Sequence, residues 1–174
     1  HDITERKKLE HERDLLSSTM SASLNEIFLF DADTLRFRFV NEGALRNLGY
    51  SLTEMLQMTP LDLKPELTYD SFQELLVPLF QQKKPVQIFE TMHRRADGSL
   101  YPVEVHLQLF EPKGERVFFA VIQDITERKK AEDELRESEQ RFSSAFEFAP
   151  IGIALVSLDG RWMKVNHAIC ELLG

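Results

Sequence analysis

Asp124-Ile125-Thr126-Glu127-Arg128-Lys129-Lys130 directly follows an apolar stretch near the middle of the chain, and the same seven residues occur at Asp2–Lys8. Identical heptapeptides 122 positions apart indicate a duplicated unit of domain size. A second match, 125 residues apart, links Arg36, Val40-Asn41 and Leu48-Gly49 with Arg161, Val165-Asn166 and Leu173-Gly174. The sequence therefore contains the end of one module, one whole module and the opening of another.

The repeat divides the chain into four segments. We expect residues 1–23 to be the tail of an upstream module with a linker helix, and residues 24–126 to be one complete domain. Residues 127–142 are expected to form a second linker helix, and residues 143–174 the opening of another module. We expect this opening to be disordered, exchanged or docked on a neighbour, and the chain to be part of a longer protein.

Composition limits the classes of partner. The chain has 174 residues, of which 43% are hydrophobic, including 13 Phe, so the complete domain can build a core. A net charge of −8 argues against binding of nucleic acid or of an anionic membrane surface. The single Cys170 permits no internal disulfide, and no apolar run approaches a membrane span of ~20 residues. We expect a cytoplasmic segment without direct membrane contact.

Five strands are predicted in the complete domain. Ile27–Phe30 and Val117–Ile122 are continuously apolar, which is typical of buried central strands, whereas Arg36–Val40 alternates and is expected at an edge. Val86–Arg95 and Leu100–Phe110 flank an Asp-Gly turn, a strong hairpin signal. We expect Val117–Ile122 to lie between Ile27–Phe30 and Leu100–Phe110.

Helices are predicted between and around these strands. Ile3–Ser23 is expected to be a helix, and a short helix capped by Asn41 should end at Leu48, before Gly49. Another is expected at Leu52–Gln57, closed by Pro60. An apolar stripe then predicts a longer helix, with a Ser71–Glu74 capping box and a kink or early end at Pro78; the stripe consists of Phe72, Leu75, Leu76, Leu79 and Phe80. The order predicts an α+β fold, a five-stranded antiparallel sheet with helices on one face.

These motifs resemble those of a PAS domain over nearly the whole complete module, Leu24 to Thr126. The resemblance rests on Val40-Asn41, Ala44, Leu48-Gly49-Tyr50, Arg95-Ala96-Asp97-Gly98-Ser99 and Ile122–Lys130. Residues 148–154 with Asp159-Gly160-Arg161-Trp162 resemble the start of a second PAS domain. Such arrays are similar to the sensory regions of bacterial cyclic-di-GMP enzymes with GGDEF or EAL domains, and of histidine kinases. The resemblance implies a non-catalytic sensor with its output domain elsewhere in the longer chain.

A ligand pocket is expected between the sheet and the helices. The residues predicted to line it are Leu29, Phe39, Asn41, Leu45, Leu48, Leu56, Leu76, Phe80, Met92, Val105 and Phe119. An ordinary apolar core is the alternative interpretation of this set, and a helix cap is the alternative for Asn41. Glu90, Arg94 and Arg95 are interpreted as surface residues of the strands.

The sequence limits which cofactors the complete domain is expected to bind. A cysteinyl-flavin adduct needs a thiol, and residues 24–126 contain no cysteine. A haem ligand of this family is expected on a helix, whereas His93 and His106 fall on predicted strands, and the histidines lack metal-ligand spacing. No phosphate-binding glycine loop or nucleophile motif is present, so no enzyme is predicted in this chain. Non-covalent flavin, a small organic ligand and no ligand at all remain open.

Asp124, Ile125 and Thr126 stand where the last strand passes into a helix. Asp124 with Glu127 offers a capping box, and Thr126 is the alternative cap. The motif either starts a helix or also couples the sheet to it, and its repetition at Asp2 favours coupling. The resemblance implies that these three residues are the signal exit.

The helix after this motif has a weak heptad seam, formed by Ala131, Leu135, Ser138, Phe142 and Ala145. A lone helix this polar is marginal, so a partner helix is expected. We predict a homodimer through the flanking helices; the alternative is a helix packed on its own sheet. A ligand-free module for dimerisation and relay is therefore the second functional hypothesis.

Overall fold

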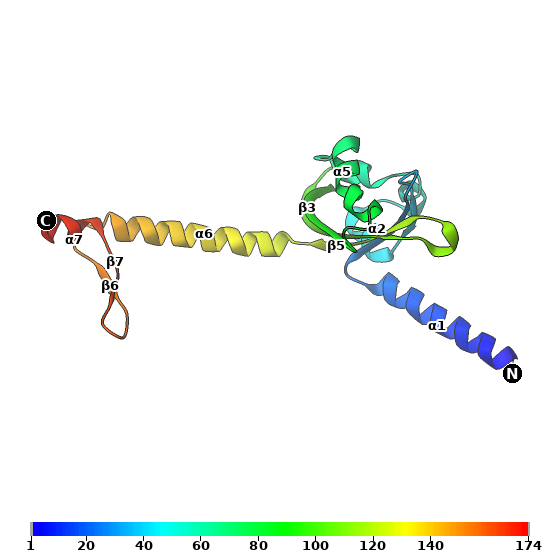
Figure 1. Ribbon diagram of the computed structural model, residues 1–174, viewed down its shortest axis with the longest axis horizontal. Helices are drawn as coiled ribbons and strands as arrows, with labels where there is room; N and C mark the ends of the chain where they lie inside the picture. Colours follow the sequence, from blue (N-terminus) through cyan, green and yellow to red (C-terminus); the bar gives the residue numbers. More distant parts are fainter. Residues whose placement is uncertain (1, 174) are drawn as a thin grey trace. The chain divides into compact units, whose positions relative to one another are not determined.

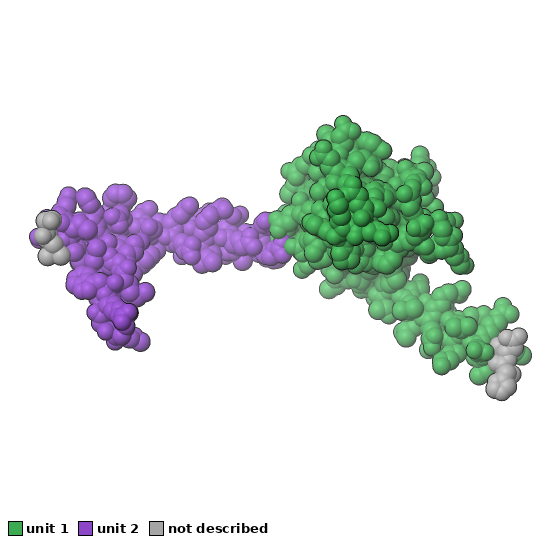
Figure 2. All heavy atoms as spheres, in the orientation of Figure 1, with its two compact units in different colours: residues 1–126 green, residues 127–174 purple. Residues whose placement is uncertain are grey.

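The computed structural model describes residues 2–173, so His1 and the Gly174 of the second motif match lie outside the described residues. The chain forms two compact units, one up to Thr126 and one from Glu127 onward (Figure 2). Within the described part of the chain, no helix is long and apolar enough to cross a membrane.

The first unit has the α+β fold expected from the sequence (Figure 1). Its helices are α1 (Asp2–Ala22), α2 (Glu42–Leu48), α3 (Leu52–Met55), α4 (Pro60–Leu63) and α5 (Tyr69–Phe80). Its strands are β1 (Glu26–Asp31), β2 (Phe37–Val40), β3 (Gln87–Arg94), β4 (Leu100–Phe110) and β5 (Val117–Asp124), with a 3-10 turn at Pro112–Gly114.

The five strands form one antiparallel sheet in the order β2-β1-β5-β4-β3. The prediction that β5 lies between β1 and β4 is confirmed, as is the edge position of β2. On the inner face, Phe28 and Phe30 of β1 lie opposite Ala120 and Phe118 of β5. These side chains pack in one buried core with residues of the covering helices, among them Leu48, Met55, Leu63, Phe72 and Leu76.

Helix boundaries differ from the prediction where proline is involved. Pro60 does not close α3; it begins α4, a position that proline favours because its missing N–H is not needed there. The predicted Ser71–Glu74 capping box is wrong, because α5 begins earlier and Thr68 forms the box with Ser71. Pro78 lies inside α5, which ends two residues later at Phe80.

Asn41 joins three segments through its side chain. Its Oδ1 accepts hydrogen bonds from the backbone amides of Ile27 (2.9 Å) and Ala44 (3.0 Å). Its Nδ2 donates to the carbonyl oxygens of Met20 (3.0 Å) and Asn25 (3.0 Å). The predicted cap of α2 is confirmed, and the same amide also fixes the end of α1 and the start of β1.

The second unit repeats this arrangement. It contains most of α6 (Thr126–Glu147), an antiparallel hairpin of β6 (Ala154–Val156) and β7 (Trp162–Val165), and α7 (His167–Leu173). Asn166 Oδ1 accepts hydrogen bonds from the amides of Ile153 (2.9 Å) and Ile169 (3.3 Å), and its Nδ2 donates to the carbonyl of Ile151 (2.9 Å). The opening module, expected to be disordered or exchanged, has regular elements here.

Replacing Asn41 with Ala should destabilise the first unit by about 2–4 kcal/mol, more than a simple cap, because buried backbone groups lose their partners. Hydrogen exchange of the β1 and β5 amides measures this loss. Asn25→Ala, at an exposed neighbouring asparagine, is the control and should stay within about 0.5 kcal/mol of the unchanged protein. Equal effects of the two variants would contradict the three-segment role of Asn41.

Candidate functional site

Seven of the predicted pocket residues lie on the helix-covered side or near it. Leu48, Leu76 and Val105 are buried in the core, and Leu45 and Phe80 pack against it. Leu56 is half-buried outside this cluster, and its neighbour Met55 is buried instead. Asn41 is buried, but backbone groups engage both its amide oxygen and its amide nitrogen.

The other four predicted pocket residues point to the opposite face of the sheet. Leu29 pairs with Phe39 and Phe119 in neighbouring strands, and all three are half-buried on the side away from the core. Met92 lies between the inward-facing Thr91 and His93 and therefore also faces outward. The prediction that these four lie between the sheet and the helices is wrong. In the continuously apolar strands of Leu29 and Phe119, the sequence does not indicate which alternate residues face the core. Phe39 faces outward because a bulge in the pairing of β1 with β2 breaks the alternation after the inward-facing Phe37.

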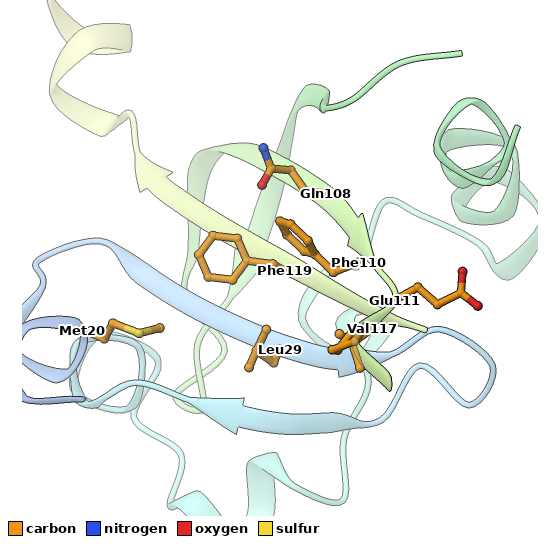
Figure 3. A pocket seen from close by; sticks show the side chains of 8 residues that line it. Met20, Leu29, Gln108, Phe110, Glu111, Val117 and Phe119 are labelled. Atoms are coloured by element: carbon orange, nitrogen blue, oxygen red, sulfur yellow. The ribbon is translucent and has the colours of Figure 1, made fainter. Parts of the chain in front are cut away.

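An open apolar groove lies on this outer face (Figure 3). Leu29, Phe119 and Phe110 form its floor, and Met20 of α1 reaches its edge. Phe110 remains 48% exposed and its ring lies 6.3 Å from that of Phe119. The groove can accept an apolar surface, because it offers few groups for hydrogen bonding.

The inner side of the sheet holds a small cavity of about 10 Å³. Its wall is apolar except for Lys64 and includes Phe28, Phe37, Phe72 and Phe89. A space of this size holds at most one water molecule. In this conformation the core therefore has no room for a flavin or another organic ligand, and binding requires the core to open.

A cluster of polar side chains is also buried on the inner side of the sheet. Glu26 is 3% exposed, and its Oε1 accepts hydrogen bonds from the hydroxyl of Tyr101 and from Asn47 Nδ2 (2.6 Å). His93 Nδ1 lies 3.4 Å from the Tyr101 hydroxyl and 3.4 Å from Glu26 Oε2. Four elements, β1, β3, β4 and α2, thus meet at one carboxylate.

Burial controls the charges of this cluster. Burial, with the positive charge of Lys64, lowers the pKa of His93 to about 4, although Glu26 opposes the shift. Burial lowers the pKa of Lys64 to about 8, again against the effect of Glu26. Burial and the negative charge of Glu26 raise the pKa of Tyr101 well above its ordinary value. At neutral pH, His93 is neutral and Tyr101 keeps its proton.

The sequence did not reveal this cluster. Glu26 follows another polar residue, Asn25, directly before an apolar strand, and His93 was assigned only to a strand. A usable signal was present, because the Asp-Gly hairpin places His93 opposite Tyr101 in the register of β3 and β4. The position of Glu26 beside them depends on the register of β1 against β5, which continuously apolar strands do not indicate.

Arg95 connects the buried cluster with the end of β5. Its Nε donates to the carbonyl of Asn47 (3.0 Å), and its Nη2 donates to Asn47 Oδ1 (3.2 Å). Its guanidinium carbon lies 3.8 Å from the centre of the Tyr101 ring, and Nη2 lies 3.8 Å from Asp124 Oδ2. The interpretation of Arg95 as a surface residue is corrected, since its side chain is only 26% exposed.

The predicted signal-exit residues meet at the start of α6. Asp124 Oδ1 accepts hydrogen bonds from the amide (2.9 Å) and hydroxyl of Thr126. Ile125 is buried, and its amide donates to the carbonyl of Pro102 (3.1 Å) in β4. The strand is therefore held to the sheet up to the residue before the helix. The capping box with Glu127 stays a prediction.

A metal centre is not evident in the described part of the chain. Among residues 2–173, no three or more His, Cys, Asp or Glu side chains are grouped so that they could hold an ion. Cys170 is exposed and belongs to the second unit.

The buried His93 should make stability depend on acidity. Its folded pKa of about 4 lies below the ordinary 6.5, so the unfolded chain binds more protons between these values. Its contribution is complete above pH 6.5 and is lost as the pH falls toward 4. Urea midpoints of His93→Gln and His93→Phe should therefore fall less steeply over this range than those of the unchanged chain. Parallel slopes would show that His93 does not govern the acid response.

Comparison with known protein families and with curated proteins gives consistent matches. A family profile described as a PAS domain matches residues 25–127, and a second PAS domain profile matches residues 140–174. The methyl sulfide methyltransferase-associated sensor of Methanosarcina acetivorans is 30% identical over 108 residues, 62% of this chain and 11% of that protein. The probable diguanylate cyclase DgcE of Escherichia coli is 45% identical over 40 residues, 23% of this chain and 4% of that protein.

A solved structure is similar to this chain over most of its length. The PAS domain of an HTR-like protein from Haloarcula marismortui has a TM-score of 0.62 at 29% identity, covering 70% of this chain and 98% of that one. The chain spans only 11% and 4% of the two curated relatives above, which are a sensor and a probable cyclase. From its profile matches and its sheet, the chain belongs to the PAS domain family, whose members are sensory domains typical of signal-transduction proteins.

Proposed function

We propose that residues 24–126 sense a small organic ligand or cofactor and relay its binding through α6 to an output domain in a longer bacterial protein. A diguanylate cyclase or phosphodiesterase is the favoured output, and a histidine kinase is the next. The likeness to a probable diguanylate cyclase supports this preference. With it we propose a cytoplasmic location, linker helices at residues 1–23 and 127–142, and a second PAS module from residue 143.

The contacts of Arg95 carry this proposal. One guanidinium touches Asn47 of α2, Tyr101 of β4 and Asp124 at the end of β5. Asn47 and Tyr101 both donate hydrogen bonds to the buried Glu26. A ligand that displaces Glu26 or its partners therefore acts on Arg95, and through it on the residues that begin α6.

Arg95 acts mainly by positioning. Its pair with Asp124 spans 3.8 Å, and the Asp124 side chain is 41% exposed, so the pair itself contributes about 0–1 kcal/mol. The directional bonds to Asn47 and the stacking on Tyr101 determine where the guanidinium lies. Ligand binding then shifts the equilibrium between conformations of the junction of β5 and α6. The free energy of this shift is limited by the difference in the affinity of the ligand for these conformations.

Variants of Asp124 separate helix capping from coupling. Asp124→Ala removes both the bond to Thr126 and the charge facing Arg95, whereas Asp124→Asn keeps an acceptor and removes the charge. Capping alone predicts a loss of about 1 kcal/mol for Ala and little for Asn, with regulation intact. Coupling predicts that both variants, and Arg95→Lys, lose the response of the output domain to stimulus in the full-length protein while the domain stays folded.

The matched control is Arg94→Lys, at the exposed residue beside Arg95 that donates to the carbonyl of Asp62 in α4. Its response to stimulus should be unchanged. Output activity with and without stimulus is the measurement, with hydrogen exchange of the first turn of α6 as a check on folding. A normal response in folded Asp124→Ala would leave this motif as a helix cap only.

A ligand-free module for dimerisation and relay is the second candidate, and the small size of the cavity favours it. On α6, the predicted seam residues Leu135 and Phe142 are 61% and 56% exposed, as expected of a helix face that awaits a partner. Native mass spectrometry with an absorbance spectrum separates the two candidates. A retained small molecule supports sensing by ligand, whereas an empty chain supports relay alone.

The proposed homodimer can be tested by substitutions on α6. Leu135→Glu places a charge in the seam and should shift the chain from dimer toward monomer in light scattering at micromolar concentration. Gln140→Glu introduces the same charge off the seam and should leave the dimer intact. A chain that is monomeric before substitution would exclude the seam as an interface.

A further inference from the structure

An exposed face of α6 carries the seam of the proposed homodimer. The helix runs without a break from Thr126 to Glu147 (Figure 1). Its seam residues recur in steps of four and three and are all exposed; they are Ala131, Leu135, Ser138, Phe142 and Ala145. Exposed leucine and phenylalanine side chains at this spacing are typical of a helix that packs against another helix. The sizes and charges along α6 indicate how a second copy of the helix fits.

Large and small residues alternate along this seam. The large residues are Arg128, Leu135 and Phe142, and the small residues that follow them in turn are Ala131, Ser138 and Ala145. A parallel pair in register places each residue opposite its own copy, so a layer of two large side chains alternates with a layer of two small ones. The large layers hold the helices apart, and the small layers then leave voids between them.

An antiparallel pair places a large residue opposite a small one in every layer. Phe142 of one copy then faces Ala131 of the other, and Leu135 faces Ser138 in the neighbouring layer. Because every layer then has a similar total volume, the helices keep one distance along the whole seam. This direction also separates the two Arg128 side chains, which meet in a parallel pair.

The residues beside the seam form two rows. One row consists of Glu127, Glu134 and Arg141, and the other consists of Glu132, Glu139 and Phe146. In a parallel pair, a residue of the first row meets the residue five positions later in the second row of the other copy. Glu134 then lies near Glu139, and Glu127 lies near Glu132. Both contacts bring like charges together, which weakens a parallel pair.

In an antiparallel pair, residues of the same row meet instead. Glu134 of each copy then lies near Arg141 of the other, which gives two attractive pairs. In the second row Glu132 lies near Glu139, so one type of repulsive contact remains. The two directions therefore differ mainly at Glu134, which faces a glutamate in one and an arginine in the other. Charge and size thus favour the same direction.

We infer that α6 pairs with α6 of a second copy in the antiparallel direction, with Leu135 facing Ser138 and Glu134 facing Arg141. This inference rests on the proposed homodimer, to which it adds the direction and register of the helices. The segments that lead to the output domains of the two copies then start at opposite ends of the pair.

Charge reversal at Glu134 tests the direction, because the two directions predict changes of opposite sign. Glu134→Lys places a lysine near Arg141 in an antiparallel pair and should raise the dimer dissociation constant about three- to tenfold in sedimentation experiments. Adding Arg141→Glu exchanges the two charges and should restore the constant to within about twofold. Glu137→Lys makes the same charge change off the seam and is the matched control. A dimer that is tighter in Glu134→Lys than in this control would overturn the inference.

Disulfide trapping measures the same geometry independently. Cysteines are introduced into chains with Cys170→Ser, since Cys170 is the single native cysteine and is exposed. A mixture of Glu134→Cys and Arg141→Cys chains in glutathione buffer should form several-fold more mixed disulfide than a mixture of Glu134→Cys and Glu139→Cys chains. Concentrated urea controls for thiol reactivity and should make the two yields equal. Equal yields without urea, or the reverse order, would exclude the antiparallel pair.

The outcomes also separate this inference from the proposed function. If the chain is dimeric and Glu134→Lys tightens the dimer, the homodimer stands with parallel helices and the inference fails. If the unchanged chain is monomeric, the homodimer and its direction fail together. A lost stimulus response in folded Asp124→Ala still supports the proposed relay in either case.

Discussion

A buried carboxylate imposes the main constraint on this domain. Glu26 is buried, so its hydrogen-bond donors must come from the protein instead of from water. Tyr101 of β4 and Asn47 of α2 supply them. His93 reaches the same carboxylate from β3. Because each partner belongs to a different element, the polar cluster fixes how strands and helix meet. A change at this carboxylate is therefore felt by several elements at once.

The position of Arg95 follows from this constraint. Asn47 and Tyr101 are held by Glu26, and they in turn hold the guanidinium that faces Asp124. Directional contacts thus fix the guanidinium of Arg95, whereas its link to Asp124 at the end of β5 is a weak ion pair. The exit itself is bonded to the sheet by the amide of Ile125, which donates to the carbonyl of Pro102.

The asparagine that occurs in both copies imposes a second constraint. It concerns the backbone junction within each module and not the buried polar cluster. Asn41 and Asn166 both satisfy backbone amides and carbonyls at the junction of a strand and a following helix. One side-chain amide has two donors and an acceptor oxygen, which is enough to close such a junction. The same residue therefore recurs in both copies, although only the first copy has the complete sheet.

The amino-acid sequence determined the strands, the hairpin, the Asn41 cap and the PAS family, because hydrophobic period and turn chemistry are local. It also indicated the central strands, because these are continuously apolar. It did not determine that Leu29, Phe39, Met92 and Phe119 face away from the core. Continuously apolar strands do not indicate which alternate residues face inward, and the bulge that turns Phe39 outward is set by the pairing of β1 with β2. Nor did it indicate the Glu26 cluster, the contacts of Arg95 or the burial of Lys64. These depend on residues up to 75 positions apart, such as Glu26 and Tyr101, and only tertiary packing decides which distant side chains share a space without water.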